Sequence, residues 1–250
     1  MTSLKTSIKT ITYLSDTGCL EIQGASLLRH ITFTVFITTS MNTLATGMVP
    51  ETSVLLVDEK RGEASINIKN TDDHPSLLYT TIVDLPESNK SIRLIPTQPV
   101  IRVEAGQVQQ VRFLLQATVP LQSEELKRVT FEGIPPKDDK SSRVTVSIRQ
   151  DLPVLIHPAS LPEERETWKF LEWRKNGDQI EISNPSNYVV RMTLQFKTLP
   201  SGKTGAINKT YFLPHTSTTT ALTNATDTKV EFYPASRYGY RGNKYVTDLK

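Results

Sequence analysis

Short runs of apolar and β-branched residues, separated by turn-forming residues, recur from Val49 to the end of this 250-residue chain. The separators are rich in Gly, Asn, Asp and Pro, which either tolerate a positive φ or fix their own φ. Helical periodicity is absent apart from one possible helical turn at residues 123–126. This alternation predicts an all-β fold made of antiparallel sandwiches.

The runs fall into two sets, with a proline-containing segment at residues 158–162 between them. The Asn-Gly-Asp sequence at residues 176–178 predicts a tight hairpin in the second set. We therefore expect an N-terminal domain at residues 46–158 and a C-terminal domain at residues 159–250. The expected strands are residues 53–57, 64–69, 77–83, 92–95, 108–115, 127–132 and 143–156, then 168–174, 179–183, 188–196, 209–213, 217–222 and 229–233.

The first 45 residues differ from the rest and predict a leader that contains a secretory signal peptide. A basic flank at Arg29 and His30 precedes an apolar core at residues 31–37, and Ala45 provides a small residue for cleavage. Residues 1–26 lie ahead of this signal, so either translation starts near residue 27 or the leader is long. The alternative is a strand or tail of the folded domain. Cleavage after Ala45 would remove Cys19, the only cysteine.

Composition and motifs exclude several classes of function. The net charge is only +3 and no basic run with interleaved aromatics is present, which argues against nucleic-acid binding. No stretch of about 18 apolar residues occurs, so we expect no membrane insertion of the mature chain. The four histidines lack metal-ligand spacing, and neither a phosphate-binding loop nor a nucleophile elbow is present. We expect no enzyme activity, no metal and no cofactor.

The sequence at residues 144–148 alternates three β-branched apolar residues, Val144, Val146 and Ile148, with polar Thr145 and Ser147. A period of two places the apolar side chains on one face of an extended strand. The ordinary interpretation is a half-buried strand of a sandwich. The alternative is a strand that lends its apolar side chains to another protein, because it lies where one set of strands ends and the next begins.

Seven short motifs in this order resemble periplasmic pilus assembly chaperones of the chaperone–usher pathway. They extend from residue 70 to residue 239, across both expected domains. They are Asn-Thr-Asp at 70–72, Thr-Gln-Pro-Val at 97–100, the Arg-Val-Glu-Ala-Gly-Gln run at 102–107, Gly-Ile-Pro-Pro at 133–136, Leu-Ile-His-Pro at 155–158, Asn-Pro-x-x-Tyr at 184–188 and Arg-Tyr-Gly at 237–239.

The resemblance implies two immunoglobulin-like β-sandwich domains in a boomerang arrangement, located in the periplasm. Such a chaperone binds a pilus or fimbrial subunit that lacks its last strand, inserts its own edge strand, and delivers the subunit to an outer-membrane usher. In this chain the donor side chains match Val144, Val146 and Ile148. The short charged loop at residues 135–142 resembles that of the members serving rod-like pili. The alternative function is a non-catalytic, two-domain immunoglobulin-like surface or adhesive module, in which the same strand would be internal.

Two departures from the family pattern concern charged positions. Members of the family hold the carboxylate of the subunit with an Arg and a Lys, and an alignment without gaps puts Ser53 and Pro153 at these positions. The candidate anchors are therefore Ser53 itself or a relocated cation, with Arg149 as first choice and Lys60 and Arg61 less well placed.

The second departure concerns the contact between the domains. The family commonly joins its domains by an acid–Arg–acid network. Here His157 takes the Arg position and Arg237 takes one acid position, with Glu124 or Glu125 as the remaining acid. This rearranged set still allows an Arg–Glu pair, and we expect Glu124, His157 and Arg237 to form the interdomain contact.

Overall fold

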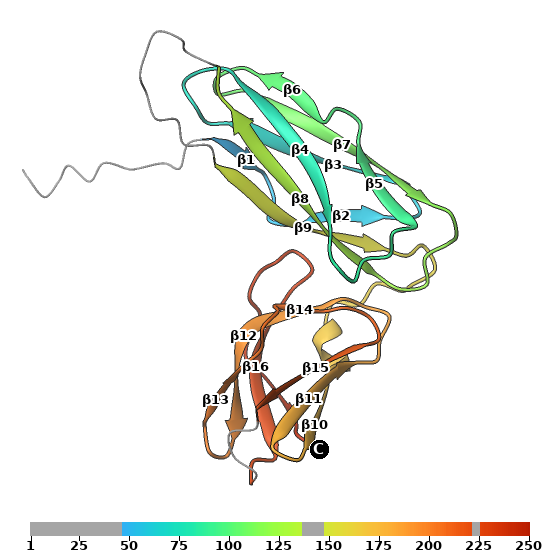
Figure 1. Cartoon of the computed structure of the whole chain (residues 1–250), viewed down its shortest axis with the longest axis vertical. Helices are drawn as coiled ribbons and strands as arrows, with labels where there is room; N and C mark the ends of the chain where they lie inside the picture. The colour runs from blue at the N-terminus through green and yellow to red at the C-terminus, as the bar shows by residue number, and fades with distance from the viewer. Residues whose placement is uncertain (1–46, 137–147, 222–225) are drawn as a thin grey trace, which may run out of the picture. The chain divides into compact units, whose positions relative to one another are not determined.

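The computed structural model describes residues 47–136, 148–221 and 226–250, which belong to one compact unit. Within these ranges the chain forms seventeen β-strands and one turn of 3₁₀ helix, η1 (Thr167–Phe170). The strands gather in two successive β domains with separate hydrophobic cores (Figure 1). The expected all-β, two-domain fold is confirmed.

The N-terminal domain contains nine strands: eight follow one hydrogen-bonded path, β5-β7-β3-β2-β9-β8-β4-β6, and β1 pairs with β3 beside this path. Strand β2 joins two antiparallel halves, because it pairs with β3 at one end and runs parallel to β9. The strands are β1 (Met48–Pro50), β2 (Leu55–Asp58), β3 (Glu63–Asn70), β4 (Ser76–Asp84), β5 (Ile92–Pro96), β6 (Val100–Val103), β7 (Val108–Ala117), β8 (Glu125–Ile134) and β9 (Arg149–His157).

The core of this domain is filled by alternate apolar residues from both halves. Phe113 of β7 and Phe131 of β8 are fully buried, and their rings meet edge to face with centroids 6.5 Å apart. Ile66 and Ile68 show the period of two directly, since both are buried while Asn67 between them is partly accessible. The two halves therefore form the layers of a sandwich around one core.

The C-terminal domain has two sheets, one in the order β10-β11-β15 and one in the order β13-β12-β16-β17 with β14 paired to β12. Trp173 of β10 packs between Phe196 of β12 and Phe232 of β16, with ring centroids 5.1 and 5.4 Å away. The strands are β10 (Glu172–Asn176), β11 (Gln179–Asn184), β12 (Val190–Leu199), β13 (Thr204–Ala206), β14 (Tyr211–Phe212), β15 (Thr216–Ala221), β16 (Lys229–Ala235) and β17 (Tyr245–Asp248).

The observed strands differ from the expected ones where the alternation of apolar and polar residues in the sequence is weak. Residues 167–170 form η1 rather than the start of a strand, so β10 begins only at Glu172. The helical turn expected at residues 123–126 is wrong, because β8 begins at Glu125. Four strands were missed, β1, β6, β13 and β17, and each has only three or four residues. Strands this short show too few alternations to be recognised by period.

A third, smaller apolar cluster lies where the domains meet. It combines Val54, Leu126 and Leu155 of the N-terminal domain with Val189 of the C-terminal domain, all of them buried. The backbone N–H of Glu124 also donates to the carbonyl of Asn187 over 2.8 Å. Burial of these side chains removes apolar area from water and contributes to the stability of the contact.

Candidate functional site

The first half of β9 has strand pairing on one side only. Residues Arg149–Pro153 pair with Glu132–Arg128 of β8, but the parallel pairing of β9 with β2 begins only at Val154. Among the described residues, no strand pairs with Arg149–Pro153 on the side away from β8. This edge presents backbone groups to which an extended peptide can add as a further strand.

A separate group of exposed apolar side chains lies on β8, β4 and β6, which are on the other side of β9 from this edge. Their fractional exposures range from 39% to 51%, and cross-strand pairing places Leu77 beside Ile134 and Tyr79 beside Val100. Contiguous exposed apolar groups of this kind indicate a binding surface. The residues are Leu77, Tyr79, Val100 and Ile134, and the strand register places them on the same face as Arg149, opposite to that of Ile148.

Of the three expected donor residues, Ile148 lies within the described part of the chain. Its side chain is 39% exposed, and its Cβ lies 3.9 Å from the position that a Cβ on Gly47 would occupy. Val144 and Val146 lie outside the described residues. The proposed role of the three therefore remains a prediction.

Arg149, the first-choice cation for anchoring a carboxylate, already has a carboxylate partner. Its Nε and Nη2 donate to Oε2 of Glu132 over 2.9 and 2.7 Å, and the two residues are cross-strand neighbours. Charge-assisted hydrogen bonds of this kind are among the stronger pairs in proteins. A second anion would have to compete with Glu132 for this guanidinium.

Ser53 lies before β2 and contacts the C-terminal domain. Its hydroxyl donates to the backbone carbonyl of Tyr238 over 2.9 Å, which occupies its one proton. Beside it runs a groove of about 560 Å³ that includes Val54, Leu152 and Tyr240 among its lining residues. We name this the β9 groove; it follows residues 150–152 of the open edge.

Pro153 is opposite Arg128 in the β8–β9 pairing and carries no charge.

Glu124, His157 and Arg237 come together at the contact between the domains. Oε1 of Glu124 lies 2.8 Å from Nδ1 of His157 and 3.7 Å from Nη2 of Arg237, while its Oε2 accepts a hydrogen bond from the N–H of Val189. Glu163 lies 3.5 Å from the other side of Arg237. A buried carboxylate with this many partners is well compensated for its loss of hydration.

Glu125, the alternative acid, has a different place. Its Oε1 accepts a hydrogen bond from the N–H of Asn89 over 2.8 Å, within the N-terminal domain. Burial raises the pKa of the Glu125 carboxyl above its ordinary value of 4.5, against the lowering effect of that hydrogen bond. Glu124 is therefore the acid that meets His157 and Arg237.

Sequence reasoning missed Arg191, a half-buried arginine of β12. It follows the Asn-Pro-x-x-Tyr motif and stands between Val190 and Met192, which are both buried. A charge within such an apolar run was the available signal, but alternation with a period of two is equally typical of an outward-facing residue on a strand. Burial, and then the nearby charge of Arg128, lower the pKa of Arg191 from its usual value.

In the part of the chain that the structure describes, no group of three or more His, Cys, Asp or Glu side chains could hold a metal ion. Across those same ranges, no helix has the length and apolar character needed to cross a bilayer.

Two family models match the chain in succession. Residues 47–162 match the model described as "Pili and flagellar-assembly chaperone, PapD N-terminal domain". Residues 166–245 match "Pili assembly chaperone PapD, C-terminal domain". Together the two matches cover more than half of the chain and almost all of its described residues.

Curated chaperone proteins are similar to this chain at low sequence identity. The chain is 28% identical over 160 residues to the chaperone protein caf1M of Yersinia pestis, covering 54% of this chain and 62% of that one. It is 25% identical over 161 residues to the chaperone protein PsaB of Yersinia pestis, covering 58% and 59%. The chain thus spans less than two thirds of these relatives. A stretch of 27 residues is also 96% identical to 29% of the uncharacterized protein YuaK of Escherichia coli, which is 11% of this chain.

Solved structures share the fold. The SafB chaperone of Salmonella enterica, in complex with the SafA pilin, superposes with a TM-score of 0.67 at 16% identity over 83% of this chain and 98% of that one. The Escherichia coli chaperone DraB gives 0.65 at 19% identity over 82% and 97%. With these two immunoglobulin-like folds and both domain models matched in order, the chain belongs to the PapD-like family of pilus assembly chaperones.

Proposed function

We propose that this protein is a periplasmic chaperone that binds pilus subunits by lending them a strand. The single observation that carries the proposal is the open edge of β9, residues Arg149–Pro153, which lacks a partner among the described residues on the side away from β8. A subunit that is short of one strand exposes unpaired N–H and C=O groups beside an apolar groove. An added strand forms hydrogen bonds with these backbone groups, and its apolar side chains fill the groove.

Side chains would supply the apolar part of the interaction. Val144, Val146 and Ile148 alternate with polar residues, so all three would enter the subunit from one face of the strand. Burying each large side chain contributes on the order of 1.5–3 kcal/mol.

The partners we propose are pilus or fimbrial subunits and, for delivery, an outer-membrane usher. The solved complex of the SafB chaperone with the SafA pilin supports subunit binding as the shared activity of the fold. The complex of the CsuC chaperone with the tip adhesion subunit CsuE points in the same direction. We propose that the protein needs no cofactor and acts by binding rather than by catalysis.

An adhesive surface module is the other candidate that the sequence leaves open. In such a module the strand that contains β9 would be enclosed between neighbours. The open edge of Arg149–Pro153 favours the chaperone instead.

The test is subunit capture in the periplasm. Val146→Arg and Ile148→Arg should each abolish co-purification of a co-expressed subunit that lacks its last strand, because an unpaired charge would enter an apolar pocket at a cost of several kcal/mol. The matched controls are Thr145→Arg and Ser147→Arg, on the polar face, which should retain capture. Equal losses on both faces would mean that the strand is ordinary core and would refute strand donation.

A further inference from the structure

Strand β12 of the C-terminal domain contains a large bulge where it pairs with β16. Met192 pairs with Pro234 at one side of the bulge. The next pair along β12 is Phe196 with Phe232, so three residues of β12 stand opposite Tyr233 alone. Extra residues in one strand of a pair bend that strand and redirect its side chains.

The bulge turns Leu194 out of the core. In a regular strand Leu194 would point inward together with Met192 and Phe196, which lie two positions away on either side and are both buried. Leu194 is instead 45% exposed. Its backbone is fixed, because its carbonyl accepts the N–H of Ile207 over 2.9 Å. The strand geometry thus holds a large apolar side chain at the surface.

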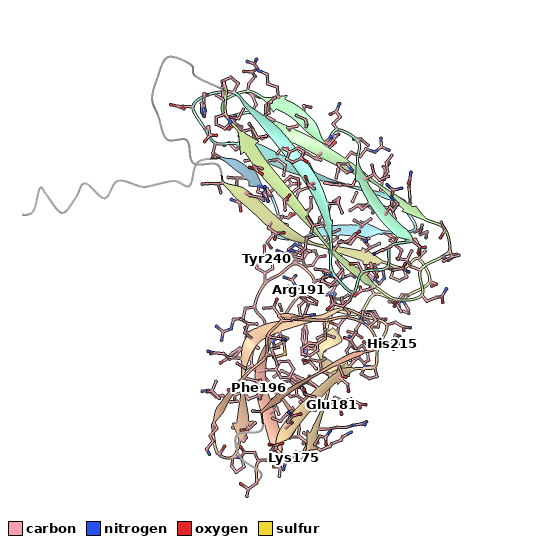
Figure 2. All side chains as sticks on the ribbon, viewed as in Figure 1. Lys175, Glu181, Arg191, Phe196, His215 and Tyr240 are labelled. Carbon is pink, nitrogen blue, oxygen red and sulfur yellow. The ribbon has the colours of Figure 1, made fainter. Side chains whose placement is uncertain are left out.

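Leu194 lines a pocket of about 450 Å³, a volume in the range of small-molecule sites. The buried ring of Phe196 lines it from the core side, and β13 fixes this ring, because a Cβ on Gly205 would overlap it. Figure 2 shows Phe196 in the middle of the domain, away from the end that carries Arg191 and Tyr240. The pocket shares no lining residue with the β9 groove.

Two cations border the pocket. Lys197 is the cross-strand partner of Glu231, and both lie next to buried core residues in their strands, so they face outward. Arg241 lies before β17, where its backbone forms an isolated bridge with Ala235. Its guanidinium carbon lies 3.8 Å from the centroid of the Tyr233 ring. Stacking on a ring leaves the in-plane N–H donors of a guanidinium available.

Neither cation has a carboxylate partner in the part of the chain that the structure describes. No ion pair or hydrogen bond joins the side chain of Lys197 or Arg241 to residues 47–136, 148–221 or 226–250. The acid among the lining residues, Glu231, is paired with Lys244 over 3.3 Å. The pocket therefore combines an apolar wall with a surplus of positive charge, which attracts anions.

We propose that this pocket binds a single amphiphilic molecule with an apolar chain and an anionic head group. The chain would cover Leu194 and the ring of Phe196, which removes exposed apolar area from water. The head group, a sulfate, phosphate or carboxylate, would accept charge-assisted hydrogen bonds from Lys197 and Arg241. Such a site goes beyond the proposed function and does not depend on strand donation.

The experiment titrates four probes with the same octyl chain into the purified protein, below their micelle-forming concentrations, and follows backbone amide resonances by NMR. Octyl sulfate and octanoate are anionic, octyl glucoside is neutral and octylammonium is cationic. The anionic probes should shift the resonances of residues 193–197 and 231–241. They should bind about tenfold or more tightly than octyl glucoside, the factor expected for a charge-assisted hydrogen bond, and octylammonium should bind most weakly. Equal affinities for octyl glucoside and the anionic probes would overturn the proposal.

Two variants test the head-group side of the pocket. Lys197→Gln and Arg241→Gln should each weaken octyl sulfate binding about tenfold and leave octyl glucoside binding unchanged. The matched control is Arg174→Gln, which removes an exposed arginine of β10 that pairs with Glu172. This control should bind both probes as the wild type does. If it weakens octyl sulfate as much as Arg241→Gln does, the charge effect is general to the surface and the site is refuted.

Leu194→Gln tests the apolar side of the pocket. It should weaken octyl sulfate and octyl glucoside by the same factor, because both chains lose the same contact. The matched control is Leu114→Gln, since Leu114 is a leucine of similar exposure, 39%, on β7 of the N-terminal domain. Wild-type affinity in Leu194→Gln, or an equal loss in Leu114→Gln, would overturn the proposal.

Two further measurements separate a bound molecule from a membrane surface and from the proposed function. Phosphatidylglycerol vesicles should not co-sediment the protein, and co-sedimentation that is lost in Arg241→Gln would overturn the proposal in favour of a lipid surface. Subunit capture should be unchanged in Arg241→Gln and Leu194→Gln, because neither residue lies on the donor strand or the open edge. A wild-type protein that fails to capture subunits would refute strand donation, while the octyl titrations would still decide the pocket.

Discussion

Oε1 of Glu124 lies 2.8 Å from Nδ1 of His157, and the other ring nitrogen of His157 lies 2.9 Å from the carbonyl oxygen of Leu161. The imidazole ring is therefore held between two oxygen atoms, one from the side chain of Glu124 and one from the backbone of Leu161. Glu124 is only 2% exposed and also receives the N–H of Val189 from the other domain. One buried carboxylate therefore collects donors from both domains.

Glu124→Ala should be strongly destabilising, because it leaves His157, Arg237 and the N–H of Val189 without their shared acceptor. We expect a loss of about 3–5 kcal/mol in the free energy of unfolding, measured by urea denaturation. Glu124→Gln should cost less, since it keeps an acceptor. Glu163→Ala is the matched control, as its side chain is 78% exposed and contacts the same Arg237, and it should cost less than about 1 kcal/mol. Similar losses at both positions would contradict this account.

The sequence predicts much of the fold because its signals are local. The Asn-Gly-Asp turn at residues 176–178 forms a two-residue hairpin in which Asn176 pairs with Gln179 and Gly177 has a φ of 62°. Asn70 and Asn184 were recognised only as parts of motifs. The structure shows why these positions are asparagine: both amides are fully buried, and each donates to a backbone carbonyl at the end of a neighbouring strand, Val103 of β6 and Phe212 of β14.

The site was less predictable because it depends on contacts distant in sequence. The pairing of Arg149 with Glu132 follows from the β8–β9 register, which no local pattern specifies. Arg128 and Arg149 form ion pairs with Asp151 and Glu132, whereas Arg191 has no ion pair among the described residues. A sequence shows that a charge lies in an apolar run, but it does not show whether the fold brings a partner to it.

Glu125→Gln should stabilise the protein at neutral pH. Burial raises the pKa of Glu125 in the folded state, so the ionised carboxylate costs stability once the pH exceeds its unfolded-state value. The penalty is absent below the unfolded-state pKa and complete above the folded-state pKa. The melting temperature of the variant should exceed that of the wild type at about pH 7.5, and the difference should shrink towards about pH 4. A difference in melting temperature between the variant and the wild type that does not change with pH would point to a cause other than ionisation.

Gly239→Ala should be more harmful than Gly177→Ala, although both glycines have a positive φ, 84° and 62°. The backbone strain is comparable, but a Cβ at position 239 would stand 3.1 Å from Cγ2 of Val54, whereas nothing lies within 4 Å at position 177. Gly177→Ala should cost about 1 kcal/mol from strain alone. Gly239→Ala should cost more and should loosen the contact of Ser53 with Tyr238, detectable as faster amide exchange around Ser53. Equal costs would mean that the interdomain contact adjusts freely.

Asp84→Ala should reveal the cost of an unpaired buried ammonium. The side chain of Lys127 is fully buried on β8, and its Nζ lies 2.6 Å from Oδ1 of Asp84, which is half exposed. Removing Asp84 leaves the buried charge without this carboxylate, and we expect a loss of about 3 kcal/mol in urea denaturation. Lys127→Met keeps most of the volume and removes the charge, so it should be close to neutral in the same measurement. Glu172→Ala, which breaks the exposed pair with Arg174, is the control and should cost less than about 1 kcal/mol. If Lys127→Met were as damaging as Asp84→Ala, the ion pair itself, rather than the compensation of a buried charge, would be the stabilising element.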